Sequence, residues 1–209
     1  MKRGYRKRAR RQGLVPSYHG WQPRQFQLGE WKYVDTVFNP DVNTTMAYQS
    51  LNVMQLGNTA STRVGQKIAV RSIELRIQVR PTAATGVEQF GRFIVVLDRQ
   101  PNAAAPAAAT DFMAAATTTS PRALTNRKRF KFLLDRSYAL GSVVAGTNTS
   151  TPTSRYYHIY MKLRRPIIVE FNAANNGTVA DISTNHIFYT TVGSEAAGNT
   201  DSISQVYLS

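Results

Sequence analysis

The stretch from Arg63 to Arg80, RVGQKIAVRSIELRIQVR, contains two alternating apolar patterns that differ in phase. Apolar residues are even-numbered in its first half (Ile68, Val70) and odd-numbered in its second half: Ile73, Leu75, Ile77 and Val79. Alternation with a period of two is typical of a β-strand with one buried face. Because a slip of one residue would turn every later side chain to the wrong face, the pattern predicts a β-bulge at Arg71–Ser72. We expect one long bent strand, which passes from one sheet edge to another in a sandwich or jelly roll.

The same alternation recurs along the chain and predicts about eight main strands with almost no helix. The segments with strand character, by residue number, are 30–38, 63–80, 90–98, 126–135, 155–163, 167–171, 178–183, 185–192 and 203–209, and 46–56 is a weaker strand or a turn. Segment 90–98 is apolar on both faces, as in a central strand. Asn176-Gly177 predicts a type I′ hairpin turn, and a further turn is expected at 183–185. The predicted fold class is all-β, a single antiparallel jelly-roll sandwich.

Residues 102–119 are rich in alanine and threonine and predict a long surface loop. Thr110 is expected to cap one short helix that runs to Ala116, where three threonines weaken it. A loop of this length favours a role at an exterior or inter-subunit surface over a compact enzyme.

Positive charge is concentrated at the N-terminus. The chain has 26 Lys and Arg against 12 Asp and Glu, a formal net charge of +14. Eight of these cations and no acid lie within residues 1–24, so a basic segment precedes a mildly basic body. Like charges at this density repel one another and bury nothing, which predicts a disordered basic arm. We divide the chain into an arm with its linker, 1–28, and a jelly-roll domain, 29–209.

This charge distribution points to nucleic acid as the partner. The candidate phosphate-binding cations of the arm are Lys2, Arg3, Arg6, Lys7, Arg8, Arg10, Arg11 and Arg24. Tyr5 and Trp21 lie among them and are suited to stacking on unpaired bases. The first seven of these cations also read as a nuclear-import signal or a solvated tail, and import is compatible with binding. A second basic cluster consists of Arg127, Lys128, Arg129 and Lys131, for which a solvated strand face and a phosphate contact are equally good explanations.

Several kinds of chemistry have no support in the sequence. Cysteine is absent, and the three histidines (His19, His158 and His186) do not have the spacing of metal ligands. No nucleotide-binding or nucleophile motif occurs, so we expect no enzyme, no cofactor and no metal. No apolar run is long enough for membrane insertion, and the N-terminus lacks the pattern of a secretory signal. Asp35 is expected to be a structural hydrogen-bonding residue, and His158 a packed interface group rather than a titrating switch.

The order of several motifs resembles that of capsid proteins from small circular single-stranded DNA viruses of the circovirus-like group. These motifs are the basic arm, KYVDT at 32–36, RVGQKI at 63–68, NRKRF at 126–130 and the late FN…NNGTV…DI segment. The resemblance spans nearly the whole chain, although the arm is shorter than the arginine tails of many circoviruses. It implies a jelly-roll subunit, sixty copies in an icosahedral (T=1) shell, a single-stranded DNA genome inside, and nuclear import through the arm.

The expected function is therefore a capsid protein that self-assembles and packages single-stranded DNA through its basic arm. Its expected locations are the virion and, during assembly, the host nucleus, with the host import machinery as a further partner. The alternative is a non-capsid single-stranded nucleic-acid-binding protein, and the third reading is a metal-dependent nuclease. Assembly state separates them, because only a capsid subunit forms a particle of megadalton mass.

Overall fold

The computed structural model describes residues 32–40, 42–81, 88–141, 154–194 and 200–208. These residues form nine strands and two single-turn 3₁₀-helices: β1 (Val34–Phe38), β2 (Ala47–Ser50), β3 (Lys67–Pro81), β4 (Gln89–Asp98), η1 (Ala109–Asp111), β5 (Phe130–Leu140), β6 (Arg155–Phe171), η2 (Val179–Asp181), β7 (Ile182–Thr184), β8 (His186–Gly193) and β9 (Thr200–Leu208). The expectation of an all-β chain with almost no helix is confirmed.

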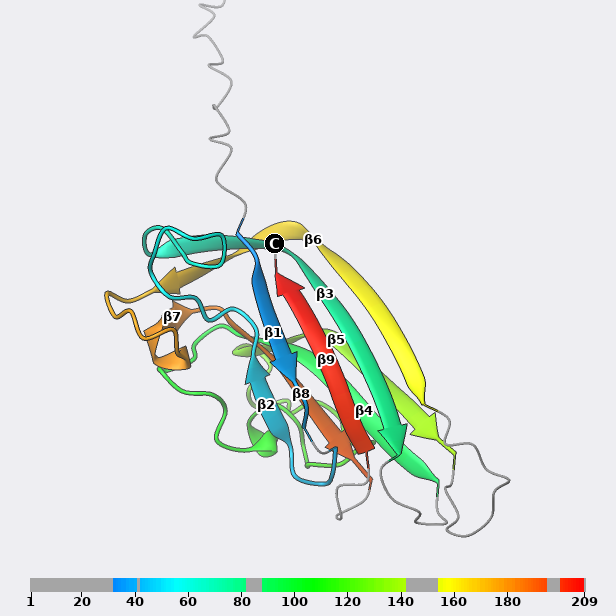
Figure 1. The fold of residues 1–209 in the computed structure, drawn as a ribbon. Helices are drawn as coiled ribbons and strands as arrows, with labels where there is room; N and C mark the ends of the chain where they lie inside the picture. The colour runs from blue at the N-terminus through cyan, green and yellow to red at the C-terminus, as the bar shows by residue number, and fades with distance from the viewer. Residues whose placement is uncertain (1–31, 41, 82–87, 142–153, 195–199, 209) are drawn as a thin grey trace, which may run out of the picture. The chain divides into compact units, whose positions relative to one another are not determined.

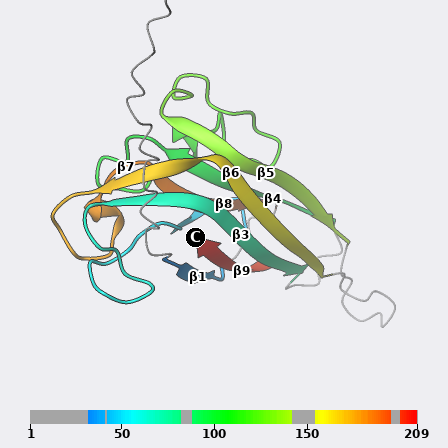
Figure 2. The ribbon, with the colours of Figure 1, turned by 90° about the horizontal axis from the view of Figure 1, so that it is seen from above.

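The strands form two antiparallel sheets, with the orders β1-β9-β3-β6-β7 and β2-β8-β4-β5 (Figure 1). Four pairs are nested in sequence: β1 with β9, β2 with β8, β3 with β6, and β4 with β5. This is the pairing that results when a long hairpin is wrapped so that alternate pairs enter opposite sheets. The chain is therefore a jelly roll, with β7 as an extra edge strand. Figure 2 shows β6 and β3 lying over β8 and β4.

The main core lies between the two sheets, where the inward-facing positions of the strands meet. Its most deeply buried members include Ile73, Leu75, Ile77, Val79, Phe93, Val95, Val169, Ile187 and Tyr189. These residues recur at every second position along their strands, as expected for sheets that pack face to face.

Strand β3 changes phase at the predicted place. Its pairing with β6 shifts register between Val70 and Ser72, where β3 contributes Arg71 alone and β6 contributes residues 163–166, so the additional residues are on β6. All four odd-numbered apolar residues after the bulge are fully buried, which confirms the change of phase. The expected passage between sheet edges is wrong, because β3 pairs with β6 on both sides of the bulge. Residues 163–166 of β6 lie opposite Arg71, so the two strands bend together within one sheet.

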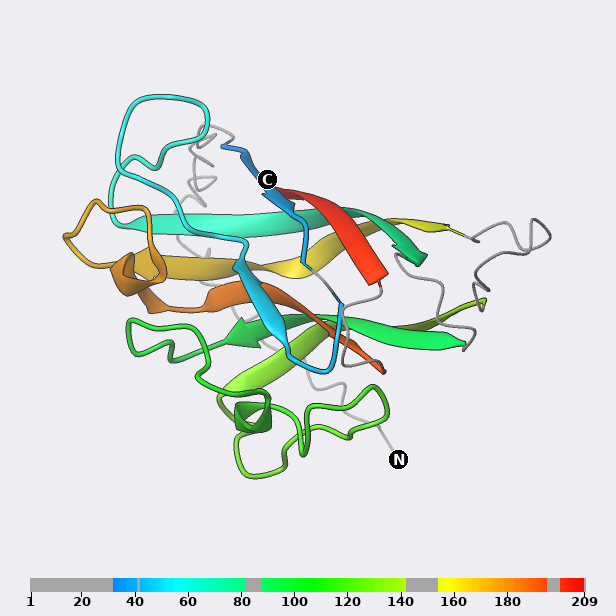
Figure 3. The same cartoon turned by 60° about the horizontal axis from the view of Figure 1, so that its bottom comes forward.

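A second core cluster lies on the other face of the β2-β8-β4-β5 sheet. Ile94 and Phe188 point to this side and contact Phe112 and Met113 from the segment 99–129. Figure 3 shows this segment, in green, beneath the lower sheet. The prediction of a surface loop at 102–119 is therefore wrong in part, because Phe112 and Met113 are almost completely buried. The sheet has apolar residues on both faces, and the loop covers the face that β3 and β6 do not.

The helix expected from Thr110 to Ala116 is also wrong. The structure has the single turn η1 at Ala109–Asp111, which starts one residue earlier. Its N-cap is Ala108, which has no side-chain oxygen with which to accept a hydrogen bond. Beyond η1, the backbone N–H groups of Ala114 and Ala115 donate to the Pro121 carbonyl and to Oγ of Ser120 rather than to the preceding turn, so the helix does not continue.

The Asn176-Gly177 hairpin is a further correction. Gly177 does have a positive φ of 66°, but no strand begins after it. Instead, the Asp181 carboxylate accepts the backbone N–H of Gly177 at 2.6 Å and ends the turn η2. The strand expected at 178–183 is thus η2 followed by β7, whereas the turn around Asn185 (φ 62°) is confirmed. The strands expected at 155–163 and 167–171 are one strand, β6.

Candidate nucleic-acid and assembly surfaces

The cationic and aromatic residues proposed in the arm lie outside the described residues and stay predictions: Lys2, Arg3, Tyr5, Arg6, Lys7, Arg8, Arg10, Arg11, Trp21 and Arg24. Within the described part of the chain, the candidate surfaces are those of the two sheets and of the segments between the strands.

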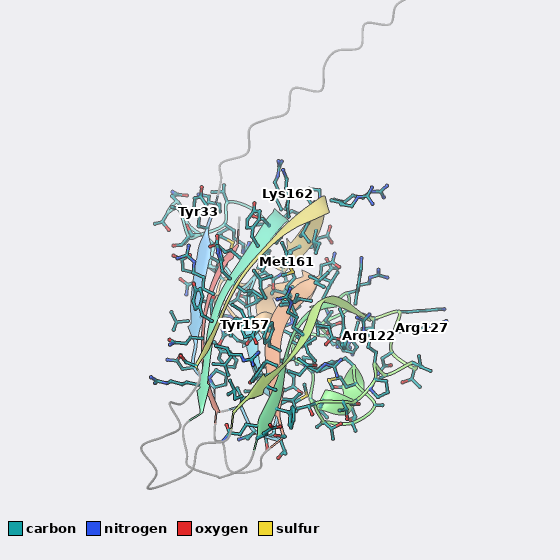
Figure 4. All side chains as sticks on the ribbon, turned by 90° about the vertical axis from the view of Figure 1, so that its right-hand side faces the viewer. Tyr33, Arg122, Arg127, Tyr157, Met161 and Lys162 are labelled. Carbon is teal, nitrogen blue, oxygen red and sulfur yellow. The ribbon has the colours of Figure 1, made fainter. Side chains whose placement is uncertain are left out.

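The second basic cluster contains two kinds of residue. Arg127 and Lys128 lie in a turn and are exposed, and Lys131 is exposed on β5, which begins at Phe130 rather than at residue 126. Figure 4 shows Arg127 extending away from the body. Arg129 differs, because its Nε and Nη2 donate to the two carboxylate oxygens of Asp98, each at 2.8 Å. These hydrogen bonds raise the pKa of Arg129. Three of the four cations are therefore exposed, and the fourth, Arg129, is half-buried and bound to the buried Asp98.

Asp98 also lies beside a histidine and a serine. His186 stands opposite Asp98 in the β4–β8 pair, and its Nε2 lies 2.9 Å from Oγ of Ser50. The side chain of His186 is fully buried, and burial lowers its pKa to about 4 against the opposing effect of the Asp98 charge. Its Nδ1 has no hydrogen-bond partner among the described residues, and the Asp98 carboxylate is occupied by Arg129. A catalytic triad needs a carboxylate–imidazole hydrogen bond and access for substrate, and His186 has neither within the described residues.

The outer face of β3 and β6 is a basic surface that the site residues chosen from the sequence did not include. Lys162 is exposed on the outer side of β6 (Figure 4), and Arg164 and Arg165 are exposed at the bend of this strand. Tyr156 and Tyr160 share the outer face with Lys162 and are 63% and 61% exposed. On β3, the cross-strand partner of each of these β6 residues is polar: Ser72 pairs with Lys162, Glu74 with Tyr160, Arg76 with His158 and Gln78 with Tyr156.

Acidic side chains on this surface are engaged by neighbouring cations. Oε1 of Glu74 lies 2.9 Å from Nε2 of His158 and accepts from Nε of Arg76 at 3.0 Å. The pKa of Glu74 is lowered, chiefly by the hydrogen bond with His158 and then by that with Arg76. His158, expected to be a packed interface group, is half exposed in the subunit and is held by Glu74. Lys67 pairs with Glu170 at 2.7 Å.

The cations at the bend of β6 have no such partner. Lys162, Arg164 and Arg165 form no ion pair with any other residue in the described ranges. The bend could have been found from the sequence by the Leu163–Pro166 run, LRRP, which puts two arginines between two alternating segments. Their position opposite Arg71 depends on strand pairing, which the sequence does not show.

Apolar side chains are exposed at the edge of the sandwich. Tyr33 precedes β1, and Val37 lies on β1; they are 52% and 62% exposed. Asp35 is exposed between them. Because β1 is an edge strand, its unpaired side and these apolar groups are suited to contact with another subunit. Among the described residues there is no helix long and apolar enough to cross a membrane, and no group of three or more potential metal ligands.

Comparison with known proteins gives the family. A family model described as "Satellite tobacco necrosis virus coat protein" matches residues 27–209. The crystal structure of the infectious bursal disease virus VP2 subviral particle matches at 7% identity and a TM-score of 0.25, over 83% of this chain and 32% of that one. No curated protein sequence matches. The expectation of a viral coat protein is thus supported, although the matched family is not the circovirus-like group that the motifs resemble. Because the match covers nearly everything beyond the basic arm, the chain belongs to the satellite tobacco necrosis virus coat protein family.

Proposed function

We propose that this protein is the capsid subunit of a virus, and that it self-assembles into an icosahedral shell of sixty copies. The observation that carries the proposal is the coat-protein family match, which starts at residue 27, where the basic segment ends. The exposed side chains of Tyr33 and Val37, at the terminal strand β1 of one sheet, support assembly, because contact between subunits would cover them.

The basic arm is the proposed packaging element. Its cations, Lys2 to Arg11 and Arg24, would neutralise phosphates and release condensed counterions, which makes binding strong at low salt and weak at high salt. Tyr5 and Trp21 would stack on unpaired bases. The same arm would serve as a nuclear-import signal read by the host machinery, which would place assembly in the host nucleus. The exposed Arg127, Lys128 and Lys131 are secondary candidates for phosphate contact.

Single-stranded DNA is the proposed cargo. This choice is supported by the motif resemblance to circovirus-like capsid proteins, while the family match supports only a viral coat protein. Neither an enzymatic function nor a non-capsid binding function has a specific observation in its favour. The internal Ser50–His186–Asp98 group lacks the geometry of a nucleophilic site.

The test is to express the full-length chain and measure the mass and shape of the product by native mass spectrometry and electron microscopy. Closed particles of megadalton mass are expected, and a stable monomer or dimer that binds single strands would favour the non-capsid alternative. Nucleic acid extracted from particles should be degraded by deoxyribonuclease and resist ribonuclease. Ribonuclease-sensitive cargo would keep the capsid function and overturn the choice of DNA.

A further inference from the structure

We propose that the outer face of β3 and β6 is a second nucleic-acid-binding surface, specific for unpaired nucleotides. Tyr156 and Tyr160 would stack on bases, and Lys162, Arg164 and Arg165 would bind the adjacent phosphates. The inference rests on the proposed packaging function and adds a site on the folded body to the arm.

The charge of the bend is the first argument. The two strands bend at the same level, so Arg71 of β3 lies opposite residues 163–166 of β6. This places four cationic side chains around one bend: Arg71, Lys162, Arg164 and Arg165. Two acids share this face: Glu74 is bound to His158 and Arg76, and Glu170 is paired with Lys67 at 2.7 Å. Lys162, Arg164 and Arg165 form no ion pair within the described residues, so they repel one another, and a polyanion would remove that repulsion.

The tyrosines are the second argument. Positions 156, 158, 160 and 162 alternate along β6 and share one face, so the aromatic rings lead in a row to the cation Lys162. At about 3.4 Å per residue, Tyr156 and Tyr160 are roughly 14 Å apart, with His158 between them. Exposed rings at this spacing, beside a basic groove or patch, are the elements with which proteins bind single strands without reading sequence. In a duplex the base faces are stacked on one another, so such rings favour unpaired nucleotides.

The opposite side of the sandwich supplies the contrast. It also carries exposed cations, but no Phe, Tyr or Trp in the fully described range 99–140 is exposed. The ring of Phe132 is covered by the guanidinium of Arg122 at 4.3 Å, and that of Phe130 by Arg129 at 4.7 Å. These rings are not open to a base. On the strands of the opposite sheet the one exposed ring is Phe90 of β4 (46%), so the β3–β6 face is the one where two exposed rings lie in line with exposed cations.

The test uses particles assembled from the full-length chain, irradiated with ultraviolet light and digested with trypsin. Cleavage after Arg155 and Lys162 releases YYHIYMK, which carries both exposed tyrosines and, as an internal control, the partly buried Tyr157 of the opposite face. Nucleotide adducts are expected on Tyr156 and Tyr160 and not on Tyr157. Adducts confined to peptides around Arg127–Lys131, or equal on all three tyrosines, would overturn the inference while leaving the packaging function intact.

Two pairs of variants test the two components. Y156S/Y160S should lower retention of single-stranded DNA by the particles at least about thirtyfold, the effect of losing roughly two stacked bases, while Y156F/Y160F should retain it. K162Q/R164Q/R165Q should make retention less sensitive to salt, and K162R/R164K/R165K should keep the wild-type salt slope. Unchanged retention and salt slope in both disruptive variants would refute the site. Wild-type particles that hold no nucleic acid would instead refute the packaging function, and this inference with it.

Discussion

Replacing Phe112 by alanine should destabilise the subunit by about 3–5 kcal/mol, the cost of deleting a buried aromatic side chain. Phe112 is 1% exposed and is the only aromatic residue of the segment 99–129, all of which the structure describes. The distances from its ring centroid to those of its aromatic neighbours are 6.2 Å to Tyr48, 5.9 Å to Phe130, 6.0 Å to Phe132 and 5.6 Å to Phe188. Because these neighbours come from β2, β5 and β8, they are fixed by sheet pairing and cannot close the cavity.

The measurement is equilibrium urea unfolding of the unassembled subunit, followed by intrinsic fluorescence. F112L, which keeps most of the buried volume, should cost less than half as much as F112A. Leu124 lies in the same segment but is 78% exposed, so L124A is the matched control and should change stability by less than about 0.5 kcal/mol. If F112A cost no more than L124A, the segment would not be part of the core and the second cluster would be misassigned.

Three further predictions concern charge. Burial lowers the pKa of His186 from its ordinary 6.5 to about 4, so between these pH values the unfolded chain binds more protons than the folded one. The free energy of unfolding should therefore fall by about 3 kcal/mol as the pH drops from 6.5 to 4. In urea titrations H186Q should lose that part of the pH dependence, and an unchanged pH dependence would contradict the prediction. R129A leaves the buried charge of Asp98 unpaired and should lower the free energy of unfolding by about 3–5 kcal/mol. The double variant R129A/D98N should regain part of that stability. Equal unfolding midpoints for the single and the double variant would argue against the ion pair. Deletion of residues 2–11 should leave the fold intact but reduce packaged nucleic acid and its salt dependence, and unchanged packaging would make the arm an import signal alone.

The strands were predictable because burial of one face requires an apolar residue at every second position. In β3 the change of phase located the irregularity at Arg71, since a strand buried on one side cannot tolerate a slip without a bulge in the pairing. That the additional residues are on β6, at 163–166, was not visible in the sequence of β3. This alternation does not show which strand pairs with which. The continuous pairing of β3 with β6 was therefore missed, and a bend within one sheet was read as a passage between sheet edges.

The candidate surfaces were predictable where they depend on composition and not where they depend on pairing. Arg127, Lys128 and Lys131 are exposed as expected, but Arg129 is bound to Asp98, which ends a strand 31 residues earlier in the chain. The bend cluster of β6 was missed for the same reason, because its members come together only when β6 lies beside β3. The prediction of a hairpin at Asn176-Gly177 was wrong although Gly177 has the positive φ that it requires. The Asp181 carboxylate accepts the Gly177 N–H, and the chain forms a helical turn there instead.

The error at residues 102–119 points to a signal that the sequence did contain. Segment 90–98 is apolar on both faces, and in a two-sheet sandwich only one of those faces meets the other sheet. The remaining face must be covered by some other apolar segment, in the same chain or in another copy. Between β4 and β5 the chain offers Phe112 and Met113 in an otherwise small and polar stretch, and these are the residues that cover it. A strand with two apolar faces therefore predicts a buried residue in a neighbouring loop, even when the loop itself has no periodicity.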